Sequence, residues 1–378
     1  MSGVYLTDEQ KAFVNSRSPR LLCLAGGGCG KTFAVSERVA NLYGEGQRVL
    51  VLAFTNSAVS VITERLNERG VPVPVRTVVS FAWEVLRDNY DIDDFAISDC
   101  DDVLEMVVAR TPVSKAQLRL FESAVANGAP ISREWSHSLV ELFNKFVQAK
   151  RERGLLSFVD VVLGAIGLPA EHYDEVIVDE AQDLTASQLA FINGLSFDRL
   201  TLVGDSEQSI FGFAGVDGQL LNELSPDFDV CYLTRSFRVP AKLMPVLNSA
   251  RVKPLVSEKP GGDFKLISAA PSEVENLVKE TVGDDWLVIV RSNREVERFT
   301  EILPETVDVL TAHKAKGGEW KNVCVVGVGA NGFETPFEVN GEEARRLFYV
   351  AVSRALENLV LIQTGDSAPF GLGGVKGE

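Results

Sequence analysis

The residues most suggestive of chemistry lie in LLCLAGGGCGKT, residues 21–32, where an apolar run is followed by glycines, a lysine and a threonine. Glycine lets the backbone adopt positive φ and approach a ligand closely. Successive N–H groups at the start of a helix attract phosphate oxygens. We therefore predict a cradle for ATP, in which Lys31 reaches the β- and γ-phosphates and Thr32 ligates Mg²⁺. Its members are Ala25, Gly26, Gly27, Gly28, Cys29, Gly30, Lys31 and Thr32.

One position departs from the strict phosphate-loop pattern, because Ala25 stands where that pattern has glycine. The alternative reading is a glycine-rich turn that binds nothing. Cys29 also raises the possibility of thiol chemistry, since neighbouring N–H groups and Lys31 favour a thiolate. We assign Cys29 a steric role, as a small side chain that lets the loop wrap the phosphates, and expect it to be the most reactive of the five thiols.

A second group of residues fits the same chemistry. In YDEVIVDEAQD, residues 173–183, Asp179 and Glu180 follow an apolar run of strand length. Ligands of parallel sheets bind beyond the carboxyl ends of the strands. Asp179 would hold Mg²⁺ and Glu180 would activate the attacking water, which predicts hydrolysis. The alternative is a pair of solvated turn residues.

The elements that must position these residues alternate between strand and helix patterns. Apolar runs rich in β-branched residues, typical of buried parallel strands, occur at 21–25, 49–54, 175–180, 199–205, 286–291 and 322–329. Amphipathic patterns between several of them indicate helices, which together predict an α/β fold. Residues 84–153 show helical periodicity and no strong strand run, so we predict a helical insertion there.

Composition excludes several classes. The five cysteines are scattered and there are three histidines, so neither a disulfide framework nor a zinc site is expected. No apolar run is long enough for a membrane span and no secretory signal is seen, which favours a cytoplasmic protein without a membrane partner. The net charge of −16 argues against binding nucleic acid through bulk charge, so any such site would be a local groove.

A series of ordered motifs carries a family resemblance. In chain order they are LTDEQKAFV, AGGGCGKT, LAFTNSAVSVITERL, GLLSFVDVV, VDEAQD, LVGDSEQSIFGFAG, LTRSFRVP, LTAHKAKGGEW and EEARRLFYVAVSRA. Together they resemble a superfamily 1 DNA helicase of the UvrD/Rep type over nearly the whole chain. The resemblance implies two RecA-like P-loop NTPase domains with parallel sheets, a small helical insertion in the first, and ATP with Mg²⁺ bound between them.

Residue roles follow from the same resemblance. It implies that Gln208 senses the γ-phosphate and that Arg238 and Arg354 act on it, completing a catalytic set with Lys31, Asp179 and Glu180. Taken alone, each arginine would be a surface or salt-bridge residue. Further nucleotide contacts are implied for Gln10, Phe33, Phe237 and Glu319, and metal ligation for Thr32 and Asp179.

DNA contacts are implied at a further set of positions. Single strands bind by stacking bases on aromatic rings and by backbone contacts. For an isolated phenylalanine, burial in the core is the alternative. The implied contacts are Phe54, Thr55, Asn56, Thr77, Ser80, Phe211, Phe213 and His313.

The chain also departs from the family pattern. Phe33 replaces an arginine that stacks on adenine, Val79 a histidine, Ala214 an arginine and Gly318 a leucine. The run at 286–303 leads almost directly into LTAHKAKG, so the large insertion of the family's second half is missing and the chain resembles a minimal motor. We expect domain 1 at 1–83 and 154–229, the insertion at 84–153, domain 2 at 230–368 and a flexible tail at 369–378.

Three functions stay open. The first is an ATP-driven translocase or helicase on single-stranded or tailed duplex DNA, with 3′→5′ polarity implied by resemblance and a role in replication or repair. The second is a DNA-stimulated ATPase that remodels protein–DNA complexes or powers a nuclease partner without unwinding alone. The third is an ATP-gated binding module without a working motor. The expected oligomeric state is a monomer.

Overall fold

The structure is a computed structural model that describes residues 5–92, 94–128, 136–210, 216, 218–329, 333, 341–364 and 372. The chain divides into two compact units. The first unit is Met1–Leu24 with Thr32–Cys231, and the second is Ala25–Lys31 with Tyr232–Glu378. The loop of residues 25–31, named here the phosphate loop, thus groups with the later part of the chain. Among the described residues, no helix is long and apolar enough to cross a membrane.

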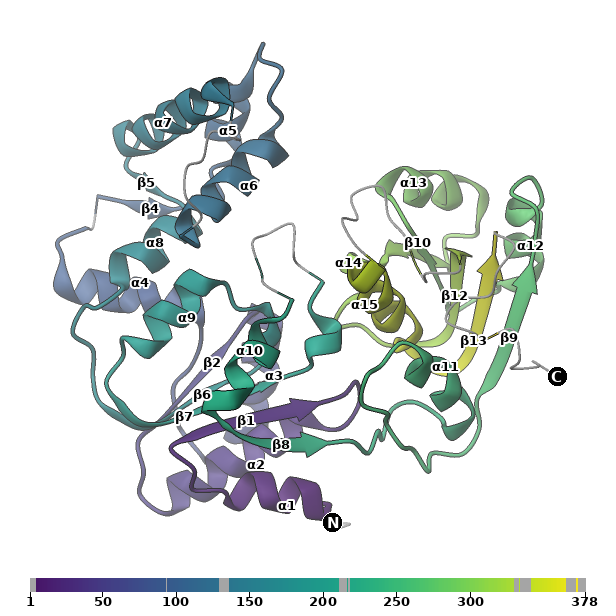
Figure 1. Ribbon diagram of the computed structural model, residues 1–378, viewed down its shortest axis with the longest axis horizontal. Coiled ribbons are helices and arrows are strands. Elements are labelled where there is room, and N and C mark those ends of the chain that lie inside the picture. Colours follow the sequence, from purple (N-terminus) through teal and green to yellow (C-terminus); the bar gives the residue numbers. More distant parts are fainter. Residues whose placement is uncertain are drawn as a thin grey trace. The chain divides into compact units, whose positions relative to one another are not determined.

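The first unit is built on a six-stranded sheet in the order β3-β2-β6-β7-β1-β8 (Figure 1). The strands from β3 to β1 in this order pair in parallel. Continuous apolar runs form the inner strands because both faces are buried, as in β2, whose five residues are all buried. The strands are β1 (Arg20–Ala25), β2 (Val49–Ala53), β3 (Val75–Thr77), β6 (Tyr173–Val178), β7 (Phe197–Gly204) and β8 (Asp229–Leu233).

Helices of this unit begin where hydroxyl side chains cap them. Thr7, Ser157 and Thr185 each form a capping box, in which a hydroxyl and the side chain three residues later satisfy the first free N–H groups. The helices are α1 (Asp8–Asn15), α2 (Lys31–Gly44), α3 (Asn56–Asn67), α4 (Val78–Asn89), α8 (Phe158–Ala165), α9 (Ala186–Asn193) and α10 (Leu220–Leu224).

Three further helices have a core of their own. Helices α5 (Asp101–Val108), α6 (Lys115–Ala126) and α7 (His137–Glu152) bury Phe121 and Phe146 completely, and Figure 1 shows them grouped beyond α8. Two short strands, β4 (Ala96–Ile97) and β5 (Leu155–Leu156), pair at the base of this group.

A buried ion network ties these helices to α8. The Lys150 ammonium, 2% exposed, contacts carboxylates of Glu122 and Asp160 at 2.7 Å each. Burial alone would lower the pKa of Lys150, but the two carboxylates outweigh it and raise the pKa. Lys150 therefore stays charged, and its charge is compensated where α6, α7 and α8 meet.

The second unit has a five-stranded sheet in the order β11-β10-β12-β13-β9, and all of its neighbours pair in parallel. With the first sheet it confirms the predicted α/β class and is consistent with two RecA-like domains. The strands are β9 (Asp263–Ser268), β10 (Trp286–Val290), β11 (Asp308–Thr311), β12 (Trp320–Val328) and β13 (Ala355–Gln363). The helices are α11 (Met244–Ser249), α12 (Val274–Thr281), α13 (Asn293–Ile302), α14 (Ala312–Ala315) and α15 (Gly341–Val352).

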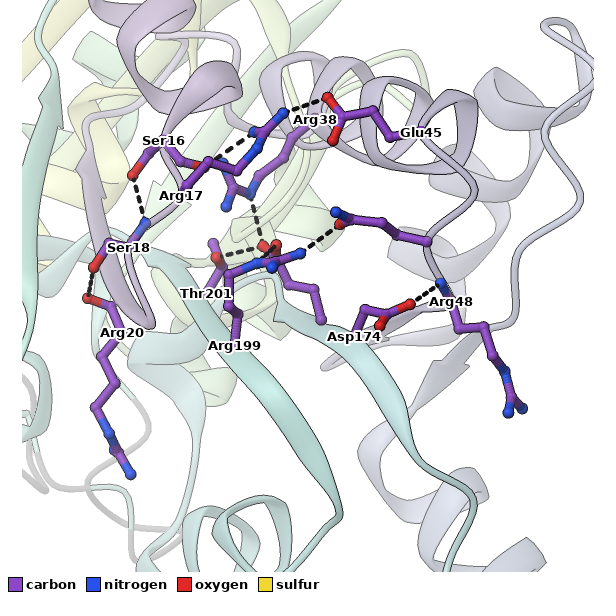
Figure 2. A network of polar contacts seen from close by, with 12 residues as sticks. Ser16, Arg17, Ser18, Arg20, Arg38, Glu45, Arg48, Asp174, Arg199 and Thr201 are labelled. Carbon is purple, nitrogen blue, oxygen red and sulfur yellow. Dashed lines mark hydrogen bonds and ion pairs between the residues drawn. The ribbon is translucent and has the colours of Figure 1, made fainter.

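A second buried ion network joins the start of the chain to the middle of the first sheet (Figure 2). Arg38 of α2 and Glu175 of β6 are both 0% exposed, and Nε of Arg38 donates to the carboxylate at 2.7 Å. Arg199 and Thr201 of β7 donate to the same carboxylate at 3.0 and 2.7 Å. Arg38 also donates to the carbonyl of Phe13 at 2.6 Å, which fixes α1 against the sheet.

We expect Glu175→Gln to destabilise the first unit by about 3–5 kcal/mol, because the isosteric amide leaves the charge of Arg38 buried and uncompensated. Urea unfolding measures the loss. The matched control is Glu171→Gln, whose exposed pair with Arg48 contributes at most about 1 kcal/mol. Equal small losses of unfolding free energy in both variants would show that the contacts of Arg38 with backbone carbonyls are enough to stabilise its buried charge.

Candidate nucleotide site

The residues predicted to handle ATP lie at the carboxyl ends of three adjacent strands. In the sheet order β6, β7 and β1 are neighbours. Asp179 and Glu180 follow β6, Asp205 and Gln208 follow β7, and the phosphate loop follows β1. This is the edge at which open parallel sheets bind ligands.

The ligand set for a divalent cation comes from the first unit. Thr32 Oγ lies 3.4 Å from Asp179 Oδ2, although the two residues are 147 positions apart in sequence. Asp179 is 2% exposed. A hydroxyl beside a buried carboxylate is a donor pair that suits Mg²⁺, which prefers oxygen ligands and retains waters and phosphate oxygens as the others. The two residues predicted as metal ligands therefore fit the ion.

Glu180 adopts an unusual backbone conformation at this edge. Its φ is +54°, in the left-handed region that residues other than glycine seldom adopt. Its N–H donates to Asp179 Oδ1 at 2.9 Å, and Gln182 Nε2 donates to its carboxylate at 2.6 Å. Strain of this kind, held by neighbouring contacts, is concentrated at functional sites. The two carboxylates have different neighbours, Thr32 for Asp179 and Gln182 for Glu180, so the two can perform different tasks.

Gln182 organises the region, and the sequence analysis assigned it no role. Its amide oxygen accepts from the N–H of Asp205 at 3.0 Å while its amide nitrogen donates to Glu180. Asp205 in turn accepts from Gln208 Nε2 at 2.9 Å. A Cβ at Gly204 would lie 2.5 Å from the Gln182 amide oxygen, which explains the glycine. Gln208, the predicted γ-phosphate sensor, is thus linked to Glu180 through two side chains.

The phosphate loop is held closely. Gly28 and Gly30 have φ of +76° and +75°. A Cβ at Gly28 would come within 2.4 Å of Arg238 Cβ, and one at Gly26 within 2.4 Å of Leu255. Position 28 requires both a positive φ and the absence of a Cβ, and only glycine provides both. This explains physically why the loop needs a glycine there.

Two predicted nucleotide residues of the second unit form an ion pair. Arg238 contacts the carboxylate of Glu319. The neighbouring Phe237 ring is 50% exposed and has the Arg235 guanidinium 5.8 Å from its centroid. An exposed ring with one face against a cation leaves area on which a flat base could stack.

Arg354 points into its own unit. It is 2% exposed, and its guanidinium donates to the carbonyls of Val350 and Gly318 at 3.0 and 3.1 Å and to Ser353 Oγ at 2.8 Å. The side chain is therefore held by contacts within its own unit.

The predicted adenine contacts differ in burial. Gln10 is 3% exposed, and its amide oxygen accepts from the N–H of Thr7 at 3.0 Å within the capping box of α1. Phe33 is half-buried in the first turn of α2.

The DNA candidates fall into three groups. Phe54, Thr55 and Asn56 follow β2. Thr77 ends the neighbouring β3 and Ser80 lies in the first turn of α4, which follows it, so these candidates lie at one edge of the first sheet. Thr55 and Thr77 also cap α3 and α4. His313 lies in α14 of the second unit. Phe211 and Phe213 lie outside the described residues, as do Ala214 and, apart from Leu372, the expected tail.

The departure at Gly318 has a steric cause. A Cβ at this position would lie 2.2 Å from the indole of Trp320. That indole is fixed because its Nε1 donates to Asp308 Oδ2 at 2.7 Å. Leucine could not occupy position 318 while Trp320 packs in this way.

The exposure of the thiols bears on the prediction that Cys29 is the most reactive of them. Cys29 is 1% exposed, whereas Cys231 is half-buried. A hydrogen bond from Cys23 lowers the pKa of Cys231, and burial raises that of Cys324 to about 12. Exposure together with thiolate character governs reactivity. The structure therefore favours Cys231 over Cys29 as the most reactive thiol.

We expect Cys29→Ser to keep ATPase activity, because the loop needs only a small side chain there. In the wild type, an alkylating reagent should modify Cys231 first, as followed by peptide mass spectrometry. Modification of Cys29 ahead of Cys231, or loss of turnover in Cys29→Ser with the fold intact, would give the Cys29 thiol a role of its own.

Two parts of the chain match models of known protein families. Residues 6–229 match the UvrD/REP helicase N-terminal domain, and residues 272–365 match the UvrD-like helicase C-terminal domain.

Individual relatives are distant. The chain is 24% identical to a probable DNA helicase of Mycoplasma pneumoniae, over 95% of the chain and 83% of that protein. It is 26% identical to ATP-dependent DNA helicase UvrD1 of Mycobacterium leprae, over 79% of the chain and 48% of that protein. It is also 26% identical to ATP-dependent DNA helicase PcrA of Staphylococcus aureus, over 68% of the chain and 41% of that protein. The chain thus spans less than half the length of the last two relatives.

Proposed function

Because the chain belongs to the UvrD/REP helicase family, we propose that it hydrolyses ATP with Mg²⁺ and uses the cycle to move along single-stranded DNA in the 3′→5′ direction. The observation that carries this proposal is the meeting of Thr32, Asp179 and Glu180 at one edge of the first sheet, beside the end of β1. Hydrolysis of a phosphoanhydride requires a bound metal ion and a carboxylate that can activate water. Thr32 and Asp179 would provide two ligands for the ion, and Glu180 would provide the carboxylate.

Each residue has a distinct task in this proposal. Thr32 and Asp179 would hold the ion, which would neutralise charge on the phosphates when bound. Glu180 would accept a proton from the attacking water, with its carboxylate oriented by Gln182. Arg238 and Arg354 of the second unit would stabilise charge that develops during hydrolysis.

Movement on DNA is proposed from the candidates at the edge of the first sheet. Phe54 offers a half-buried ring, and Thr55 and Asn56 are exposed at the start of α3. Backbone N–H groups at a helix N-terminus can contact a phosphate. With a net charge of −16, we expect binding to depend on this local surface.

A specific observation favours the second function, a DNA-stimulated ATPase that needs a partner in order to unwind. Only α13 and short loops connect β10 to β11, so no large insertion stands between Val290 and Asp308. The match to the Mycoplasma protein runs over 446 aligned positions, more than the 378 residues of this chain, so that relative carries additional residues inside the matched region.

ATPase turnover with and without single-stranded DNA tests the proposal, followed by strand displacement from duplexes with 3′ or 5′ tails. The control is Lys31→Ala, which removes the phosphate contact. We expect turnover that DNA stimulates and unwinding of the 3′-tailed substrate. Stimulated turnover without displacement would select the partner-dependent ATPase, and no turnover in either condition would leave an ATP-gated binding module.

A further inference from the structure

The phosphate loop is anchored by residues far from it in sequence. The N–H of Gly26 donates to the carbonyl of Leu233 at 3.2 Å. The carbonyl of Gly27 accepts from Ser236 Oγ at 3.0 Å, and that of Gly28 accepts from the N–H of Phe237 at 2.9 Å. These contacts, all within the second unit, fix three peptide planes of the loop.

One anchor comes from a helix much later in the chain. The N–H of Gly27 donates to the hydroxyl oxygen of Tyr349 at 2.9 Å, across 322 positions of sequence. Tyr349 lies in α15 and is 0% exposed. The guanidinium of Arg251 stands 4.7 Å from the centre of its ring, which restricts how the ring can turn.

This hydrogen bond sets the geometry of the loop at a critical point. Gly27 itself is buried, so its N–H would lack water if the hydroxyl were removed. The peptide plane that the hydroxyl holds joins Gly26 to Gly27, one residue before Gly28, where φ turns positive and the loop changes direction. Tyr349 also lies five positions before Arg354, so the same stretch of chain carries the loop's anchor and a proposed catalytic arginine.

We propose that Tyr349 is a positioning residue for the nucleotide, whose hydroxyl holds the Gly27 N–H and so preorganises the phosphate loop. This inference rests on the proposed function, because it assumes that the loop binds phosphates. A binding site that is already ordered loses less free energy on binding than one that must be ordered by the ligand. Without the hydroxyl, the loop therefore binds nucleotide more weakly.

Tyr349→Phe tests the proposal because it keeps the ring beneath Arg251 and removes only the oxygen. Two measurements are made on the full chain. Hydrogen exchange of the segment 21–32 in the nucleotide-free protein reports on the Gly27 N–H, which we expect to exchange about tenfold faster. The dissociation constant of Mg·ADP should rise by about five- to tenfold, as one hydrogen bond to a buried amide is lost.

The matched control is Tyr173→Phe. Tyr173 is also a buried tyrosine with an arginine near its ring, Arg48 at 5.7 Å, but it lies at the opposite end of the parallel strands, at the start of β6. We expect both measurements to stay at the wild-type values in this variant.

Other outcomes overturn the inference. Unchanged hydrogen exchange and unchanged Mg·ADP affinity in Tyr349→Phe would show that the other three anchors are enough to order the loop. Tighter Mg·ADP binding would show that the hydroxyl competes with nucleotide instead of preparing the loop for it. Failure of the wild type to bind Mg·ADP would refute the proposed function, while the exchange result would still decide whether the hydroxyl orders the loop.

Discussion

Glu180→Gln is expected to bind ATP with Mg²⁺ and yet hydrolyse it at least about a hundredfold more slowly than the wild type. A general base contributes roughly 10²–10⁴-fold, and glutamine cannot accept the proton. The amide keeps the size of the side chain and can still contact Gln182, so the left-handed turn at this position should persist. Steady-state turnover and equilibrium binding of ATP measure the two effects separately.

Lys31→Ala provides the contrast, because Lys31 is proposed to hold the phosphates before as well as during hydrolysis. It should lose nucleotide affinity together with turnover. If Glu180→Gln kept more than about a tenth of wild-type turnover, a loss under ~1.4 kcal/mol of activation free energy, the assignment of Glu180 as the base would be wrong.

The sequence was sufficient for β1, β2, β6, β7, β10 and β12, but it did not predict β3, β4, β5, β8, β9, β11 or β13. Continuous β-branched runs predicted buried parallel strands, and β2, β7 and β12 formed there because both of their faces are covered. The run at 175–180 was predicted too long at its end. Strand β6 stops at Val178, since the backbone at Glu180 turns to positive φ. Periodicity carries no signal for such a turn.

Contacts between distant charged residues could not be predicted. Arg38 reads as the polar face of a helix and Glu175 as the edge of a strand, yet both are fully buried because each supplies the other's counter-charge. The buried ion pairs of Lys150 with Glu122 and Asp160 were not predicted for the same reason. The roles assigned to individual site residues stay predictions, and the sequence offered no sign that Gln182 orients Glu180 or that Tyr349 reaches Gly27.

Arg354→Ala is the second variant with a large expected effect. An arginine that stabilises transition-state charge contributes about 10³–10⁵-fold to kcat, so we expect kcat to fall by that order while the KM for ATP changes little. The structure adds a second consequence. Because Arg354 is buried and donates to the carbonyls of Gly318 and Val350, truncation also costs about 1–3 kcal/mol of folding stability. Turnover must therefore be measured well below the melting temperature of the variant.

Arg346→Ala separates the two consequences, because Arg346 is another largely buried arginine of the second unit, located in α15, 8% exposed and paired with Glu342. It should lose stability with little loss of kcat. If Arg354→Ala and Arg346→Ala lowered kcat alike, in proportion to their losses of melting temperature, the loss would come from a destabilised second unit. A kcat for Arg354→Ala within tenfold of the wild type would exclude a role for its guanidinium in the transition state, and its contacts with Gly318 and Val350 would then account for its burial.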